Sequence, residues 1–202
     1  MWHSSLVEID PASLDRRGAY QLMISCIIPR PIAWVTSLSK EGVVNLAPFS
    51  YFNGVSSFPP IVSIAVGSRK GGKKDTWINI EETREFVVNV VVSETAEAMV
   101  ATSEELPHNR SELELVKLTP LPSLKVKPPR IKESPIHLEC SLYKIVEVEG
   151  SALILGRVEQ YHVDDAVLRG GTVDPGLLTF VGRLGGDGYT RVTDVLDIKR
   201  RS

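Results

Sequence analysis

One stretch in the first half of the chain carries most of the information about its fold. It runs Asn45-Leu-Ala-Pro-Phe-Ser-Tyr-Phe-Asn-Gly-Val-Ser-Ser-Phe-Pro-Pro60, continues through the apolar run Ile61–Val66, and ends in Gly67-Ser-Arg-Lys-Gly-Gly-Lys-Lys-Asp-Thr76. We interpret it as a loop of small and aromatic residues, a buried strand, and a cationic loop that opens onto a helix. Two loops of different chemistry are therefore expected at the ends of one strand.

Short apolar runs separated by turn residues continue on both sides of this stretch. Ile32–Leu38 and Val43-Val44 flank the turn Ser39-Lys-Glu-Gly42, which predicts a hairpin. The other expected elements are strands at Glu85–Val92, Ile136–Val148 and Ala152–Val163, helices at Lys74–Thr83 and at Ser93–Ser103 with Ser93 as N-cap, a proline-rich surface crossing at Leu118–Pro135 and a glycine-rich loop at Gly170–Gly188. Because most of these elements are strands, the pattern predicts a mostly β fold, a closed antiparallel barrel with helical decoration, rather than a doubly wound parallel sheet.

Length and composition indicate one soluble globular domain spanning residues 1–202, with a core at about 25–190. The chain is 43% apolar and 24% charged, and its net charge of −2 argues against a nucleic-acid-binding protein. The apolar run Leu22–Val35 is interrupted by Pro29-Arg30-Pro31, so no membrane span is expected there. Met1–Asp10 has neither a basic start nor an apolar centre, and we expect a cytoplasmic protein.

Residues for side-chain catalysis or metal binding are scattered. Cys26 and Cys140 lie far apart in apolar surroundings and are expected to be reduced core thiols, and there is no zinc-binding spacing. His162 precedes Asp164 and Asp165, but a histidine at a strand end before a polar turn is expected there rather than a metal ligand. We therefore expect no catalytic side chain and no metal, which fits a reaction whose chemistry belongs to a cofactor.

The cationic loop is a candidate phosphate site. Its Gly67-to-Gly72 spacing followed by lysine is close to the phosphate loop of nucleotide hydrolases, but Lys74 stands where that loop needs a hydroxyl to bind magnesium. Arg69, Lys73 and Lys74 supply positive charge, and Asp75-Thr76 begins a helix whose free N–H groups favour an anion. The alternative is a solvated basic turn.

The aromatic loop is a candidate site for a flat ring. Asn45–Asn53 carries Phe49, Tyr51 and Phe52 among small residues, and Pro48 would interrupt a central strand. Backbone donors and acceptors with flat apolar groups suit an isoalloxazine ring. A ring site and a phosphate site at opposite ends of one strand predict a mononucleotide cofactor, and FMN fits best.

These residues resemble the flavin reductase-like, FMN-binding split-barrel family over about Pro29 to Tyr189. The resemblance is carried by Arg30-Pro-Ile-Ala-Trp-Val-Thr-Ser37, Asn45-Leu-Ala-Pro-Phe-Ser50, Phe58-Pro-Pro60, Lys74-Asp-Thr76, Phe86-Val-Val-Asn-Val90, Pro128-Pro-Arg130, Ser134-Pro135, Leu138-Glu-Cys140 and Gly182-Arg-Leu-Gly-Gly-Asp-Gly-Tyr189. It implies a Greek-key split β-barrel, a homodimer, and FMN near the subunit interface. By the same resemblance, the ring would contact Ala47, Pro48, Phe49 and Ser50, the ribityl chain and phosphate would lie among Ser37, Ser68, Arg69, Lys74 and Thr76, and Arg183 with Tyr189 would close the site.

The function expected from the sequence is an FMN-binding oxidoreductase, a flavin reductase in which NADH or NADPH passes hydride to the flavin. Two alternatives remain open: an electron-carrier module that binds FMN but has no NAD(P)H turnover of its own, and a dimeric structural protein with an empty cleft. The sequence has no dinucleotide-binding fingerprint. Turnover with NADH or NADPH distinguishes the first two.

Overall fold

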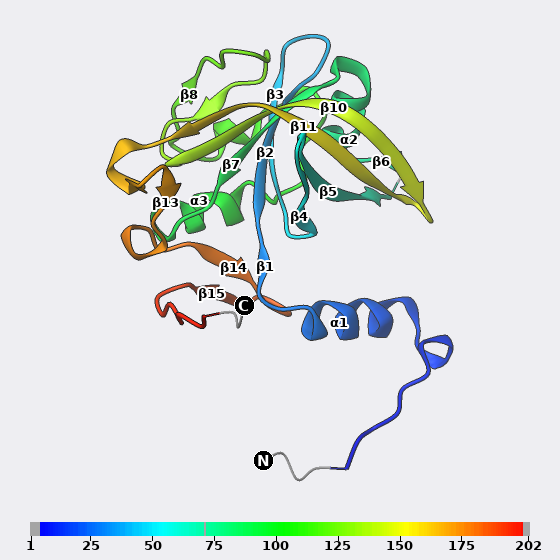
Figure 1. Cartoon of the computed structure of the whole chain (residues 1–202). Helices are drawn as coiled ribbons and strands as arrows, with labels where there is room; N and C mark the ends of the chain where they lie inside the picture. Colours follow the sequence, from blue (N-terminus) through cyan, green and yellow to red (C-terminus); the bar gives the residue numbers. More distant parts are fainter. Residues whose placement is uncertain (1–4, 71, 200–202) are drawn as a thin grey trace.

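A strongly curved antiparallel sheet forms the body of the molecule (Figure 1). The structure, a computed structural model, describes residues 5–70 and 72–199; Gly71 of the cationic loop and the first four residues of the Met1–Asp10 stretch lie outside them. The strands are β1 (Arg30–Pro31), β2 (Ala33–Leu38), β3 (Val44–Phe49), β4 (Phe52–Ser57), β5 (Pro60–Arg69), β6 (Gly72–Lys73), β7 (Glu85–Val90), β8 (Pro120–Leu121), β9 (Arg130–Ile131), β10 (Ile136–Val148), β11 (Ser151–Val163), β12 (Leu168–Arg169), β13 (Thr172–Val173), β14 (Val181–Arg183) and β15 (Tyr189–Arg191). The helices are α1 (Arg16–Cys26), α2 (Asp75–Thr83) and α3 (Ala96–Ala101), with 3₁₀ turns at Pro11–Ser13, Ser93–Thr95, Glu112–Glu114, Asp165–Val167 and Pro175–Leu177.

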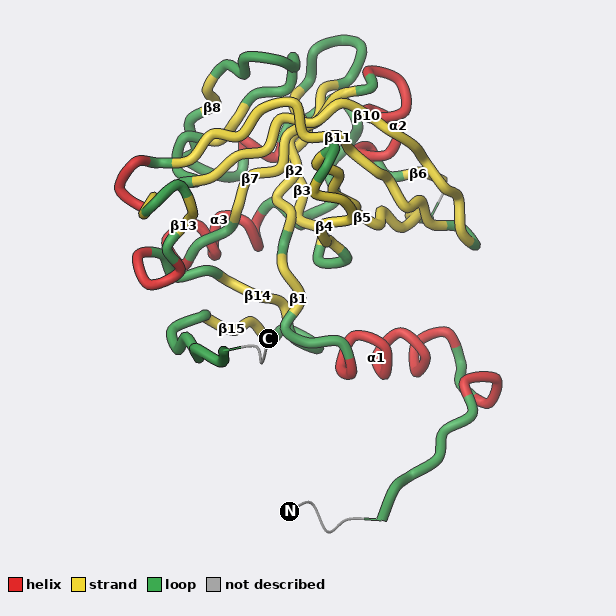
Figure 2. The backbone as a smooth tube through the Cα atoms, in the orientation of Figure 1, coloured by secondary structure: helices red, strands yellow, loops and turns green. Residues whose placement is uncertain are grey.

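The large sheet has the strand order β3-β2-β7-β10-β11-β5-β4, and β6 pairs with β5. The hairpin β2–β3 and the long hairpin β10–β11 are those expected from the sequence. Since β3 and β4 are the two ends of this order, the sheet curls into a barrel that stays split between them (Figure 2). The predicted mostly β split barrel is confirmed.

The barrel interior is filled by apolar side chains from every long strand of this sheet. Ile64, Phe86 and Ile154 are fully buried there. Helix α2 contributes Trp77 and Ile80 to the same core, so its first turn is held against the barrel. The cationic loop is therefore fixed at both ends, by β5 and by α2.

Helix α1 lies outside the barrel and was not predicted. It precedes β1, which pairs with β14 in a separate small sheet that also contains β15 (Figure 1). The helix begins at the N-cap Asp15, whose side chain accepts a hydrogen bond from the Gly18 N–H (2.6 Å), and Ile24 is its only buried residue. The expectation that Cys26 is a core thiol was wrong, because it ends this helix on an exposed face, whereas Cys140 is buried as expected.

Three local predictions need correction. Asn45–Asn53 is not a loop: β3 and β4 occupy most of it, and Pro48 is tolerated because β3 is an edge strand. The helix expected at Ser93–Ser103 begins only at Ala96, after a 3₁₀ turn, and its N-cap is Thr95 rather than Ser93. Gly170–Gly188 is also not a single loop, because β13 and β14 lie within it.

Candidate functional site

The cationic loop places its charges unequally. Arg69 at the end of β5 donates two hydrogen bonds to Asp75, the first residue of α2 (3.1 and 3.0 Å), and His108 also contacts Asp75 (2.7 Å). Lys73 pairs with Glu81 (2.7 Å) and Glu147 (3.6 Å) and lies 4.6 Å from the Trp77 ring centre. These contacts already compensate much of the charge of Arg69 and Lys73.

Lys74 is the third cation, beside Arg69 and Lys73, that was predicted to supply charge to a phosphate site. It is the half-buried N-cap residue of α2, and among the ion pairs of the described residues none includes it. Its side chain lines both of the cavities described next. A positive charge at a helix N-terminus that faces a cavity favours an anionic ligand.

Two adjoining cavities lie along the open edge of the barrel. The smaller, about 100 Å³, is lined by Asn45, Ala47, Pro48, Phe49, Arg69, Lys74, Asp75, Thr76, Thr102, Ser103, Glu104, Glu105, Leu106 and Glu112. The larger, about 410 Å³, is lined by Arg16, Tyr20, Ile24, Pro48, Phe49, Ser50, Tyr51, Ala65, Gly67, Ser68, Lys74, Glu149, Gly150 and Ser151. Pro48, Phe49 and Lys74 belong to both, so the end of β3 and the start of α2 form the ridge between them.

A buried polar network supports the small cavity from below. Asn45 Nδ2 donates to Thr76 Oγ1 (2.8 Å) and to Ser37 Oγ (3.4 Å), and Asn79 Nδ2 donates to the same Ser37 oxygen (3.1 Å). Ser37 is fully buried and Thr76 nearly so. Both residues were predicted to surround the ligand. In this chain Thr76 lines the cavity, while Ser37 lies beneath it and holds the two asparagines.

The open edge of β3 is partly covered by a buried carboxylate. Glu112 accepts a hydrogen bond from the Leu46 N–H (2.8 Å), and burial raises the pKa of this carboxyl although the hydrogen bond acts to lower it. Backbone groups alternate between the two edges of a strand, so two residues further on Pro48 also turns its backbone to this edge. Proline has no N–H, so the edge offers an acceptor there without a donor.

The structure brings most of the predicted site residues together. Ala47, Pro48, Phe49, Arg69, Lys74, Asp75 and Thr76 line the small cavity, and Ser50 and Ser68 line the large one. Sequence reasoning missed Glu112 and the segment Thr102–Leu106. Asn45 opens the motif Asn45–Ser50 but was not predicted to be a site residue. Its side-chain amide, which can donate and accept hydrogen bonds, was a usable signal.

Arg183 and Tyr189 lie elsewhere within one chain. They face each other on β14 and β15, with the guanidinium 4.3 Å from the ring centre, and Arg183 also donates to the Gly186 carbonyl (2.6 Å). Tyr189 lines a different cavity, against α3. Their role in closing the site, which the resemblance implies across a two-fold interface, stays a prediction.

His137 and His162 form contacts away from this site. His162 Nε2 lies 2.6 Å from Glu139, and His137 Nδ1 lies 2.9 Å from Asn89 Oδ1. Burial raises the pKa of Glu139, but hydrogen bonds from the Leu124 and Lys125 N–H groups and from His162 lower it overall. Within residues 5–70 and 72–199 no cluster of three metal-binding side chains occurs, and no helix there is long and apolar enough to cross a membrane.

The chain is a split barrel with two adjoining cavities and a cation at the start of α2, and comparison with known proteins identifies its family. The chain belongs to the flavin reductase-like domain family, whose model matches residues 24–183. The fold and the family expected from the sequence are both confirmed, and the family is one of oxidoreductases.

Several relatives match over nearly the whole chain. A protein of Halalkalibacterium halodurans is 39% identical over 201 residues, or 96% of each chain. Nitrilotriacetate monooxygenase component B from Bacillus cereus is similar in structure with a TM-score of 0.92 and 36% identity, covering 96% of this chain and all of its own. The 2-nitrobenzoate 2-nitroreductase of Pseudomonas fluorescens has a TM-score of 0.89 and 35% identity, covering 97% of each chain.

Proposed function

We propose that this chain is an FMN-dependent oxidoreductase that takes hydride from NADH or NADPH, a flavin reductase. The observation that carries the proposal is Lys74, a cation without an ion-pair partner in the described chain, on the ridge between two adjoining cavities. The family match and the similarity to a monooxygenase component B support it.

The donor set fits FMN. The small cavity of about 100 Å³ is below the size of a typical ligand pocket, so a mononucleotide held there extends onto the Pro48-Phe49 ridge, beside the large cavity. Lys74, Arg69 and the first N–H groups of α2 would hold its phosphate. The edge of β3 would orient its ring, and the apolar faces of Pro48 and Phe49 would exclude water from one side.

When bound, FMN supplies the two-electron redox chemistry, and the protein supplies binding and orientation. Hydride transfer between two cofactors needs no side-chain acid or base, and the two carboxylates near the ridge are already engaged. Asp75 is held by Arg69 and His108, and Glu112 is buried against the Leu46 N–H. The predicted absence of a catalytic side chain is part of this proposal.

The deciding experiment is anaerobic reduction of the FMN-loaded protein. Loss of the visible flavin absorbance on addition of NADH or NADPH supports the flavin reductase. FMN binding without such bleaching assigns the protein to the electron carriers, the alternative that the sequence left open. Failure to bind FMN refutes both.

Lys74→Ala is expected to weaken FMN binding by about 1.5–3 kcal/mol, the range for one charge-assisted hydrogen bond. Riboflavin, which has no phosphate, should bind the wild type and the variant equally. Lys70→Ala, which removes an exposed charge from the same turn but from neither cavity, is the matched control in fluorescence titrations. The rate of hydride transfer per bound FMN should stay largely intact, because the phosphate is remote from the reacting ring. A thousandfold loss of that rate in fully loaded Lys74→Ala would make Lys74 a catalytic group.

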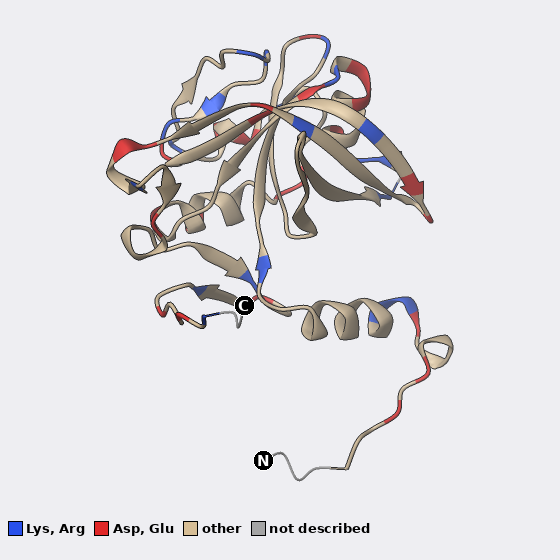
Figure 3. Ribbon diagram, viewed as in Figure 1, with Lys and Arg blue, Asp and Glu red and all other residues tan. Residues whose placement is uncertain are grey.

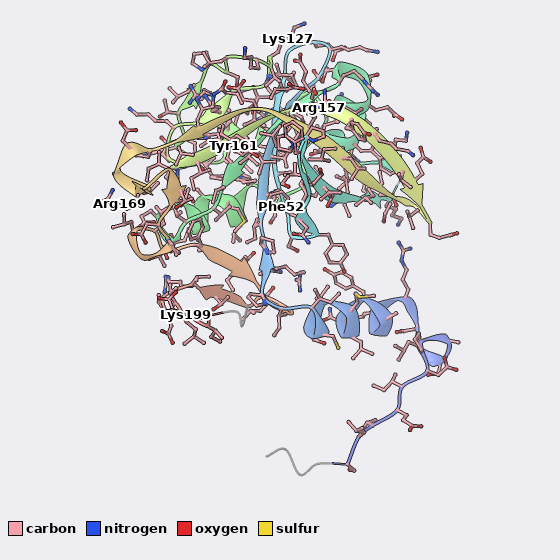
Figure 4. All side chains as sticks on the ribbon, viewed as in Figure 1. Phe52, Lys127, Arg157, Tyr161, Arg169 and Lys199 are labelled. Atoms are coloured by element: carbon pink, nitrogen blue, oxygen red, sulfur yellow. The ribbon has the colours of Figure 1, made fainter. Side chains whose placement is uncertain are left out.

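We also propose a homodimer in the cytoplasm. Large apolar side chains are exposed on the N-terminal segment, on α1 and near the C-terminus, including Leu6, Met23 and Ile198, and Phe58 is 95% exposed. The N-terminal segment and α1 extend away from the barrel, whereas Lys199, near the C-terminus, lies beside the small sheet (Figure 4). Apolar surface of this kind favours a protein partner. Light scattering should give twice the chain mass of 22.2 kDa, and a monomer with FMN fully bound would contradict the proposal.

A further inference from the structure

We propose that α1 forms a nucleoside-diphosphate subsite, in which Tyr20 stacks on the base and Arg16 contacts a phosphate of NADH or NADPH. The inference rests on the proposed function and assigns the half of the reductant that does not react. It accounts for nucleotide binding in a chain that has no glycine-rich dinucleotide fingerprint.

The large cavity has two walls from distant parts of the chain. Arg16, Tyr20 and Ile24 of α1 follow one another at intervals of four residues and therefore lie on one helix face. The opposite wall is formed by the end of β3, by Ser68 of β5 and by the turn between β10 and β11. Figure 3 shows the positively charged start of α1 below the tip of that hairpin.

The chemistry of the α1 wall suits a nucleotide. Tyr20 is 56% exposed although it lines a cavity, which leaves a ring face for a base. Arg16, one turn away, has no ion-pair partner among the described residues and presents a guanidinium fork that matches a phosphate group. Glu149 is the one carboxylate in this lining, so with Lys74 assigned to the FMN phosphate, Arg16 offsets its charge and the cavity has no net negative charge to repel a diphosphate.

The position of the cavity suits the reductant rather than a remote effector. It shares Pro48, Phe49 and Lys74 with the small cavity, so a nucleotide on α1 lies next to the FMN ring proposed for that ridge. Its volume of about 410 Å³ is within the usual range for ligand pockets. Hydride transfer requires the two rings to be adjacent, which this continuity permits.

A buried arginine fixes the α1 wall. Arg30 is 4% exposed and donates to the carbonyls of Ile24 (2.6 Å) and Ile27 (2.8 Å) at the end of α1. The same guanidinium donates to the Leu184 carbonyl (2.9 Å) and to Ser50 Oγ (3.3 Å), which lines the cavity. Helix α1 is therefore tied to the residue that follows β3, and the subsite is preorganised.

The test uses the FMN-loaded protein and ADP-ribose, a non-reactive probe that carries the base and both phosphates. Calorimetry should show binding to the wild type and affinity about tenfold lower in Arg16→Ala, the effect of one partly exposed charge-assisted contact. Tyr20→Leu, which keeps a good helix former, should lose a similar factor through lost stacking. Arg17→Ala, an exposed neighbour outside the cavity, is the matched control.

The outcomes separate this inference from the proposed function. If ADP-ribose fails to bind the wild type, or if Arg16→Ala binds it as Arg17→Ala does, the subsite is wrong. If Arg16→Ala instead weakens FMN binding, the large cavity holds the cofactor and the inference is also wrong. If NADH and NADPH fail to bleach the wild type while ADP-ribose binding still depends on Arg16, the reductase function fails and the nucleotide subsite stands.

Discussion

Replacing Arg30 with methionine is expected to release α1 from the barrel and to speed hydrogen exchange of the α1 amides by a factor of about 10²–10³. Methionine keeps the apolar stem but removes every donor. The carbonyls of Ile24, Ile27 and Leu184 then lose their partner in a buried site. A buried acceptor left without a partner costs about 1–3 kcal/mol, so leaving these three unsatisfied costs at least about 3 kcal/mol, and each 1.4 kcal/mol is about tenfold in the opening equilibrium.

The matched control for this variant is Arg110→Met. Arg110 is exposed and pairs with Glu114 on the surface, where an ion pair contributes about 0–1 kcal/mol. Its removal should leave exchange of residues 16–26 unchanged. Arg30→Met should also weaken ADP-ribose binding without changing the FMN phosphate contacts. Equal exchange of α1 in both variants would show that Arg30 does not hold the helix.

The elements predicted correctly are those whose signals are local. The β10–β11 hairpin has long stretches rich in apolar residues on both sides of Glu149-Gly150, and both turn residues have positive φ. Helix α2 follows the spacing of Trp77 and Ile80, which point into the core. Such patterns depend on residues within about ten positions, so one sequence is sufficient to interpret them.

The elements that were missed depend on tertiary context. Pro48 indicated a loop because a central strand needs its N–H, and only the sheet order shows that β3 is at an edge. Helix α1 was missed because a single buried residue, Ile24, gives almost no amphipathic signal, and its stability comes from Arg30, which follows it. The same helix explains the wrong prediction for Cys26, which lies in an apolar run but is exposed because α1 buries only Ile24.

The candidate site shows the same division. The stretch from Asn45 to Thr76 supplies most of the residues that line the two cavities, because they are close in sequence and flank one strand. Glu112 and Thr102–Leu106 reach the small cavity from a segment with little regular structure, and α1 reaches the large one from the N-terminal side. No local sequence motif predicts such residues, because only the packing of distant segments brings them to the cavities.

A second large effect is expected from acid, and it centres on His137. The side chain is 5% exposed at the start of β10, 6.2 Å from the His162 ring centre. Burial, assisted by the charges of Arg130 and His162, lowers the pKa of His137 from 6.5 to about 4. The folded protein therefore keeps this imidazole neutral in a range where the unfolded chain binds a proton.

The sign of the stability change follows from that difference. As the pH falls from about 6.5 to about 4, only the unfolded state gains the proton, so the folded state loses stability; below about 4 both states are protonated and this loss levels off. At about 1.4 kcal/mol per pKa unit, the loss amounts to about 3 kcal/mol.

His137→Gln is expected to remove this part of the pH dependence. Glutamine can still donate to Asn89 Oδ1, as His137 Nδ1 is placed to do, but it does not titrate. Urea unfolding at pH 8, 6 and 4 should give a stability difference between pH 8 and 4 that is smaller in the variant by about 3 kcal/mol. The imidazole resonances of the wild type provide an independent measurement, because His137 should remain neutral down to about pH 4. If its resonances titrate near pH 6.5, the folded state accepts the charge and the prediction is wrong. Loss of stability in acid must then come from protonation of carboxylates, and Glu139, whose pKa is lowered, is the first of these to test.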